Sequence, residues 1–99
     1  MGALSPNAIL RPVGEIVRRE IAGETILVPV RGRTADMRRI FSLNPTAAFL
    51  WARLDGKRTV SELLAELLDA FATPPDAARA DVEAFLARAL EEGLLEEAG

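Results

Sequence analysis

Hydrophobic and polar residues alternate in two runs near the start of the chain, residues 16–21 and 25–30, as they do in half-buried β-strands. Ala22-Gly23 between the runs is typical of a tight turn, so the two runs predict a β-hairpin. Pro29 cannot donate a hydrogen bond to a ladder, and therefore marks a strand end, a bulge or an edge position. A third alternating run, Met37 to Leu43, predicts another strand and completes an antiparallel meander.

The spacing of hydrophobic residues then changes to the period of amphipathic helices. Asn44 can cap the first helix, and Thr59 with Glu62 forms the capping-box pattern that starts the second. A third helix is expected from about Asp76 to Glu92, with Gly93 as its C-cap. The apolar faces of these helices comprise, in chain order, Ala47, Leu50, Trp51 and Leu54; Val60, Leu63, Leu64, Leu67, Leu68 and Phe71; and Ala78, Val82, Phe85, Leu86 and Ala89.

Three strands followed by three helices predict an α+β domain in which the helices cover one face of an antiparallel sheet. The 99 residues suffice for one small domain with one modest core, and residues 13–95 are expected to form it. Residues 1–12 have no clear period and contain Pro6 and Pro12, so we expect an irregular lead-in there. Residues 96–99 are expected to fray.

The composition removes the groups on which most enzymatic chemistry depends. The chain has no Cys and no His, so a thiolate nucleophile, the commonest general base and the commonest metal ligand are missing. Ser61 belongs to the capping box, and Trp51 lies on an apolar helix face, where core packing is favoured over a ligand platform. We therefore expect a non-catalytic protein without a cofactor or metal. With neither a signal peptide nor an apolar run of about 18 residues, it is expected to be cytoplasmic and to have no membrane partner.

The net charge of −3 is unevenly distributed along the chain. Residues 1–50 carry seven Arg against four carboxylates, whereas residues 51–99 carry five cations against eleven carboxylates. The densest cationic cluster comprises Arg31, Arg33, Arg38 and Arg39. Such charges protect an exposed strand edge from aggregation or guide an acidic partner, and the two roles are compatible.

The third predicted strand, Met37 to Leu43, is an edge of the meander in the simplest strand order. An edge strand has unpaired N–H and C=O groups that can receive a strand from another chain, either a peptide or a second copy that gives a homodimer. The third predicted helix is a candidate wall of a groove beside this edge, because its apolar arc is wider than one packing contact requires. Leu86 and Leu90 could then face a partner, although burial in the core is favoured for Leu86.

Several segments resemble one known family. They are LNPTAAFLW at residues 43–51 and LDGKRTVSEL at residues 54–63, followed by Asp81-Val82, Phe85-Leu86 and Gly93-Leu94-Leu95. In this order they resemble the PqqD-like family over about residues 13–95. The segment from Arg31 to Met37 is longer and richer in Arg than in the protein of pyrroloquinoline quinone synthesis, so the resemblance is to the wider PqqD-like group.

The resemblance implies a winged-helix-like fold and a non-catalytic role in the recognition of ribosomally made, post-translationally modified peptides. Such proteins bind the leader of a precursor peptide as a strand added to the third strand, against the third helix. They present it to a modifying enzyme, often a radical S-adenosylmethionine enzyme. Carried over by element, the implied peptide-binding residues comprise Met37, Arg38, Arg39, Ile40, Phe41, Ser42, Leu43, Arg79, Glu83, Leu86 and Leu90.

The alternative for a winged-helix-like fold is a DNA-binding regulator. Its reading helix would need cationic or amide side chains aimed at base edges. The third predicted helix offers only Arg79 and Arg88 as cations, against five carboxylates within residues 76–92. Because this acidic balance opposes approach to phosphates, we do not expect a nucleic-acid partner.

Overall fold

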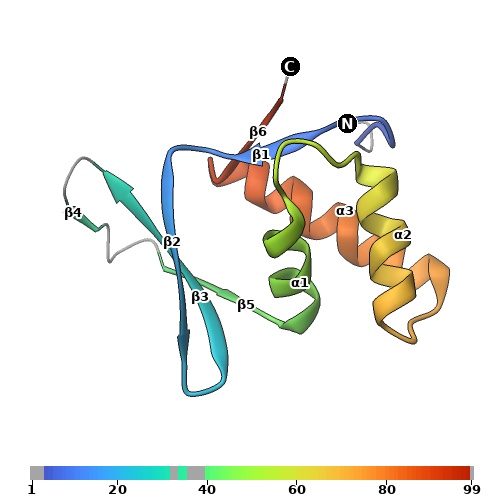
Figure 1. The fold of residues 1–99 in the computed structure, drawn as a ribbon, viewed down its shortest axis with the longest axis horizontal. Coiled ribbons are helices and arrows are strands. Elements are labelled where there is room, and N and C mark those ends of the chain that lie inside the picture. The colour runs from blue at the N-terminus through green and yellow to red at the C-terminus, as the bar shows by residue number, and fades with distance from the viewer. Residues whose placement is uncertain (1–3, 32–33, 36–39, 99) are drawn as a thin grey trace.

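The computed structural model describes residues 4–31, 34–35 and 40–98, and confirms the predicted α+β class with an antiparallel sheet followed by three helices (Figure 1). The strands are β1 (Leu10–Pro12), β2 (Glu15–Ile21), β3 (Glu24–Arg31), β4 (Thr34–Ala35), β5 (Phe41–Leu43) and β6 (Leu95–Glu97). The helices are α1 (Pro45–Arg53), α2 (Val60–Ala70) and α3 (Pro75–Glu91). Within the described residues, no helix combines the length and apolar character needed to cross a membrane.

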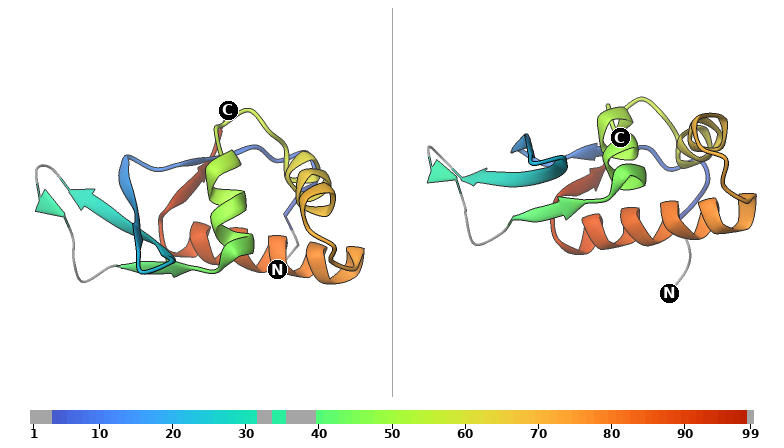
Figure 2. Two further views of the ribbon diagram at one scale, coloured as in Figure 1. Left: turned by 60° about the horizontal axis from the view of Figure 1, so that its bottom comes forward. Right: turned by 90° about the horizontal axis from the view of Figure 1, so that it is seen from below.

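The predicted hairpin is formed by β2 and β3, which pair along their whole length from Glu15 opposite Val30 to Ile21 opposite Glu24. Its turn places Ala22 at a φ of 53° and Gly23 at a φ of 83°. Positive φ at both central residues is the geometry that matches the right-handed twist of two antiparallel strands. The hairpin extends away from the helices in Figures 1 and 2.

The third strand differs from the single run expected over Met37 to Leu43. Two short strands, β4 and β5, pair with β3, on the edge that β2 leaves open. Leu27 lies opposite Phe41 in one pairing and Val30 opposite Ala35 in the other, so the register shifts between them. Pro29, which has no N–H to donate, lies at this break, where a ladder is already interrupted. Ile40 lies outside β5, and residues 36–39 lie outside the described residues.

The predicted helix caps are confirmed. The Asn44 side chain accepts a hydrogen bond from the Ala47 N–H at 2.8 Å. The Thr59 hydroxyl accepts one from the Glu62 N–H at 3.1 Å, while the Glu62 carboxylate accepts one from the Thr59 N–H at 2.9 Å. Gly93 ends α3 at a φ of 74°, a left-handed conformation that glycine adopts without a steric penalty.

The core lies where the three helices meet the sheet. The largest fully buried side chains are Leu10, Leu27, Leu50, Leu63, Leu67, Val82 and Leu86. Burying one such side chain contributes about 2 kcal/mol, so the helix faces predicted from periodicity supply most of the hydrophobic stabilisation. Trp51 is buried in the same cluster, as its position on an apolar face predicts.

The two ends of the chain are more ordered than their sequences suggest. β1 and β6 form a two-stranded antiparallel ladder, so residues 10–12 of the expected irregular lead-in (1–12) and residues 96–97 of the expected frayed tail (96–99) are in strands. Leu10 and Leu95 anchor the ladder in the core. Strands of three residues are too short to show a period, and their pairing joins segments that are distant in sequence.

Candidate functional site

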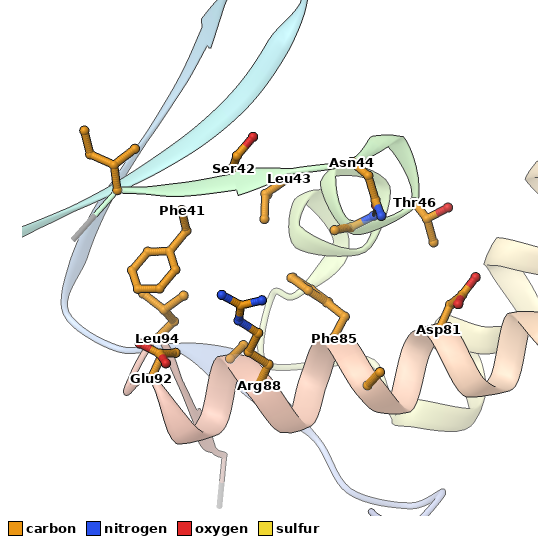
Figure 3. Close-up of a pocket in the computed structure, with 14 residues that line it drawn as sticks. Phe41, Ser42, Leu43, Asn44, Thr46, Asp81, Phe85, Arg88, Glu92 and Leu94 are labelled. Carbon is orange, nitrogen blue, oxygen red and sulfur yellow. Dashed lines mark hydrogen bonds between the residues drawn. The ribbon is translucent and has the colours of Figure 1, made fainter. Parts of the chain in front are cut away.

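A groove of about 480 Å³ runs between β5 and α3 (Figure 3). Its lining residues come from β5 with the residue before it, from the start of α1 and from one face of α3: Ile40, Phe41, Ser42, Leu43, Asn44, Thr46, Ala47, Asp81, Ala84, Phe85, Arg88, Ala89, Glu92 and Leu94. Eight of these fourteen residues are apolar and six are polar or charged. Such a composition is typical of binding sites in proteins.

The strand side of the groove is formed by β5. Phe41 and Leu43 point toward α3, and Ser42 between them points away, as the alternation of a strand requires (Figure 3). Leu43 is buried and Phe41 is half-buried, while Ile40 beside the strand is 43% exposed. Within the described residues, β3 is the one strand hydrogen-bonded to β5, so the opposite edge of β5 carries no strand there.

The helix side of the groove is formed by residues of α3 that recur every three or four positions, and therefore lie on one face. Ala84 and Phe85 lie near the middle of this face, and Arg88 follows one turn later. In Figure 3 the Arg88 side chain points from α3 toward β5, with its guanidinium between the rings of Phe41 and Phe85 in that view. A guanidinium directed into a groove can bind an anionic group that enters it.

The structure brings together only part of the residue set implied by the family resemblance. Ile40, Phe41, Ser42 and Leu43 line the groove. Met37, Arg38 and Arg39 lie outside the described residues. These seven residues belong to the strand portion of the set.

The helix portion of the implied set lies elsewhere. Arg79 and Glu83 line a second hollow of about 330 Å³, on the side of α3 that faces α2 and the N-terminal segment. Leu86 has no exposed surface, and Leu90 is half-buried against the core. None of the four lines the groove beside β5.

Sequence reasoning placed Phe85 in the core and did not assign Ala84 or Arg88 to the site. A signal was present: Arg88 follows Phe85 by three positions, which puts a cation beside an aromatic ring on one helix face. The rotation of α3 about its axis decides whether that face meets the sheet edge or the second helix. This rotation is set by tertiary packing and has no signature in the helix itself.

The groove offers groups that are suited to binding contacts. Within the described residues, no group of three or more Asp and Glu side chains is placed to hold a metal ion, and the chain has no His or Cys. The charged groups that line the groove are Asp81, Arg88 and Glu92. Together with the apolar side chains and the backbone of β5, these groups form a candidate binding surface.

The comparisons with known proteins identify the family. A family model described as "Coenzyme PQQ synthesis protein D (PqqD)" matches residues 24–95, and the chain belongs to this PqqD family. The matched range begins at β3 and ends at Leu95, so it includes every element that lines the groove. No curated protein and no solved structure matches the chain.

Proposed function

We infer that this protein is a non-catalytic peptide-binding chaperone of a biosynthetic pathway. It captures the leader of a ribosomally made precursor peptide in the groove between β5 and α3. It then presents the peptide to a modifying enzyme, a radical S-adenosylmethionine enzyme in the reading that the family resemblance favours. Membership of a family named for coenzyme synthesis supports the biosynthetic role.

The observation that carries this proposal is the position of the groove beside a strand edge. β5 is bonded to β3 on one side, and the groove runs along β5 against α3. A peptide added as a strand to β5 gains main-chain hydrogen bonds that do not depend on its sequence. Its side chains alternate, so every second one enters the space between Phe41 on the strand and Phe85 on the helix. Affinity and selectivity therefore arise from different parts of the same groove.

The expected affinity is moderate. A leader is flexible before capture, and ordering its backbone costs free energy that the groove contacts must offset. We expect a micromolar dissociation constant, which corresponds to a binding free energy of about −8 kcal/mol. Moderate affinity suits a protein that must release the peptide to an enzyme.

A matched pair of alanine variants tests the location. Ala84 is exposed and lines the groove, whereas Ala87 is exposed on the same helix and lines neither hollow. Ala84→Gln adds bulk to the groove and should weaken binding of a selected peptide at least several-fold. Ala87→Gln, the same change outside the groove, should leave binding within error of the wild-type protein. The peptide is one enriched on the wild-type protein from a display library of random sequences, and fluorescence anisotropy gives its affinity.

The same peptide tests the mode of binding by amide NMR. On titration into isotope-labelled protein, the largest shifts should fall on Phe41–Leu43 and on the Ala84–Arg88 turn of α3. Largest shifts on α2 or on the exposed edge of β2, or equal losses for Ala84→Gln and Ala87→Gln, would contradict binding at this groove. If β5 of the free protein pairs with a second copy, size-exclusion chromatography will show a dimer, and a peptide that adds to β5 will dissociate it.

A further inference from the structure

Apart from Arg31, at the edge of a described range, the described residues include seven arginines. Four of these seven pair with carboxylates of the protein itself. Arg11 pairs with Glu96 at 2.7 Å and Arg18 with Glu20 at 3.3 Å. Arg53 and Arg58 share the carboxylate of Glu66, at 3.1 Å and 2.7 Å, and Arg58 also binds Asp55. The three without such a pair among the described residues are Arg19, Arg79 and Arg88.

Of these three, Arg88 lines the groove beside β5. Its guanidinium has no hydrogen bond or ion pair with another described residue, although Glu92 lies one turn away on the same helix. It points toward β5, and in the view of Figure 3 it is seen between the side chains of Phe41 and Phe85. The groove thus holds an exposed cation whose planar donors are directed at the space that a bound strand fills.

A peptide bound in this groove displaces water from the guanidinium of Arg88. A guanidinium that loses its hydration without gaining an acceptor costs free energy, and this cost falls on every ligand that lacks one. A carboxylate is the acceptor that matches the guanidinium fork, with two parallel charge-assisted hydrogen bonds. Binding therefore discriminates in favour of peptides with an acidic side chain at the position opposite Arg88.

We propose that Arg88 is the specificity-determining residue of the groove and selects leaders in which an acidic residue lies two positions from a large apolar residue. This inference rests on the proposed function and names the class of peptide. In an added strand, residues two apart point the same way and are separated by about 6.6 Å. Phe85 and Arg88 are separated by about 4.5 Å along the helix axis. One inward-facing side chain therefore fills the apolar gap between Phe41 and Phe85, while the next reaches the guanidinium.

The other charges of the groove refine the pattern. Asp81 lines the same face two turns before Arg88, a separation of about 10 Å along the helix. Glu92 lines the groove one turn after Arg88. A carboxylate placed beside Asp81 or Glu92 is repelled, so the acidic residue of the peptide is favoured only directly opposite Arg88.

The test is a display selection with random peptides on three full-length proteins: wild type, Arg88→Glu and Arg79→Glu. Arg79 is a matched control, because it is exposed on the same helix but lines the hollow on the other side. Peptides enriched on the wild-type protein and on Arg79→Glu should carry Asp or Glu two positions from a large apolar residue. Arg88→Glu should enrich Lys or Arg at that position instead.

A charge exchange then measures the pair directly. A wild-type-selected peptide should bind Arg88→Glu about tenfold more weakly, and replacing its acidic residue by Lys should restore affinity for that variant. Arg88→Gln, which removes the charge with little change of size, should give an intermediate loss. Circular dichroism melting of each variant separates these effects from unfolding.

The outcomes distinguish this inference from the function on which it rests. If wild type and Arg88→Glu enrich the same sequences, and these shift Phe41–Leu43 in NMR spectra, the specificity role of Arg88 is wrong and the peptide-binding function stands. If Arg79→Glu changes the selection as Arg88→Glu does, the site lies on the other side of α3. If no sequence is enriched on the wild-type protein, the proposed function fails, and this inference fails with it.

Discussion

The two sides of α3 each border a hollow, and among the described residues the N-terminal segment lines one of them. On the side that faces α2, the N-terminal segment lies in place: the Val60 N–H donates to the Ala8 carbonyl at 2.9 Å, and the Ser61 N–H to the Pro6 carbonyl at 3.0 Å. We call this the closed side. On the other side, α3 faces β5 across the groove, and within the described residues no further segment lies along that strand's outer edge. We call this the open side.

The difference shows how one helix serves stability and binding at once. The first-turn amides of α2 would need water or a partner if the N-terminal segment were absent, and the chain provides that partner itself. The backbone N–H and C=O groups at a strand edge likewise need water or a partner, and on the open side another chain can provide that partner. The residues between the two sides, such as Leu86, belong to the core and hold both surfaces in their relative positions.

The largest expected effect comes from breaking this shared core. Leu86 has no exposed surface, so Leu86→Ala should lower the free energy of unfolding by about 2–5 kcal/mol, through lost burial and the cavity left behind. Urea denaturation monitored by circular dichroism measures the loss. Leu90→Ala, at a half-buried position on the same helix, should cost less. A Leu86→Ala protein of unchanged stability that binds peptide poorly would instead place Leu86 at the partner surface.

Local signals in the sequence predicted the helical half of the molecule well. Caps depend on two or three neighbouring residues, and Asn44 and the Thr59–Glu62 box are found as their spacing predicts. Helix periodicity likewise identified the buried faces, because an apolar stripe along one side of a helix is buried by packing that side against the core. The hairpin was equally readable, since Ala22-Gly23 separates two strands that are adjacent in sequence.

Long-range relations were not readable in the same way. The β1–β6 ladder joins two three-residue strands at opposite ends of the chain, and neither strand is long enough to show alternation. The candidate site depends on the rotation of α3, which puts Arg88 on the open side and Arg79 on the closed side. Both arginines lie on the same helix with similar exposure, so only the packing of α3 against its neighbours distinguishes them.

A smaller effect is expected at the cap that anchors the closed side. Thr59→Ala removes the acceptor of the Glu62 N–H and should lower the free energy of unfolding by about 1 kcal/mol. Ser61→Ala is a matched control, because it removes a neighbouring hydroxyl that has no described hydrogen bond, and should change stability by less than about 0.5 kcal/mol. Thermal melting of both variants measures the difference.

Thr59→Ala should leave the peptide affinity of the folded protein intact. Its affinity for a peptide selected on the wild-type protein should be unchanged at temperatures where it is fully folded, because the cap lies on the closed side. A clear loss of affinity in the folded variant would show that the start of α2 communicates with the groove, and that the two sides are not independent.

The smallest expected effect is a pH dependence at the connection between α1 and α2, which is also remote from the groove. The pKa of Asp55 is lowered from its ordinary value of 3.8, first because its carboxylate accepts a hydrogen bond from the Lys57 N–H, and further through the N–H and guanidinium of Arg58. A lowered pKa in the folded protein means that this carboxylate stabilises the fold at pH values above 3.8. The contribution is lost as the pH falls from 3.8 through the lower folded pKa.

Asp55→Asn should therefore flatten the stability profile in that acidic window and leave peptide affinity at neutral pH unchanged. Urea denaturation at a series of acidic pH values measures the profile, and NMR titration of the Asp55 carboxyl carbon measures the pKa itself. Asp69→Asn, at an exposed carboxylate of α2 without a described hydrogen bond, is the control for a change of net charge. An Asp55 carboxyl that titrates at or above 3.8 would mean that the hydrogen bonds from Lys57 and Arg58 do not persist in solution.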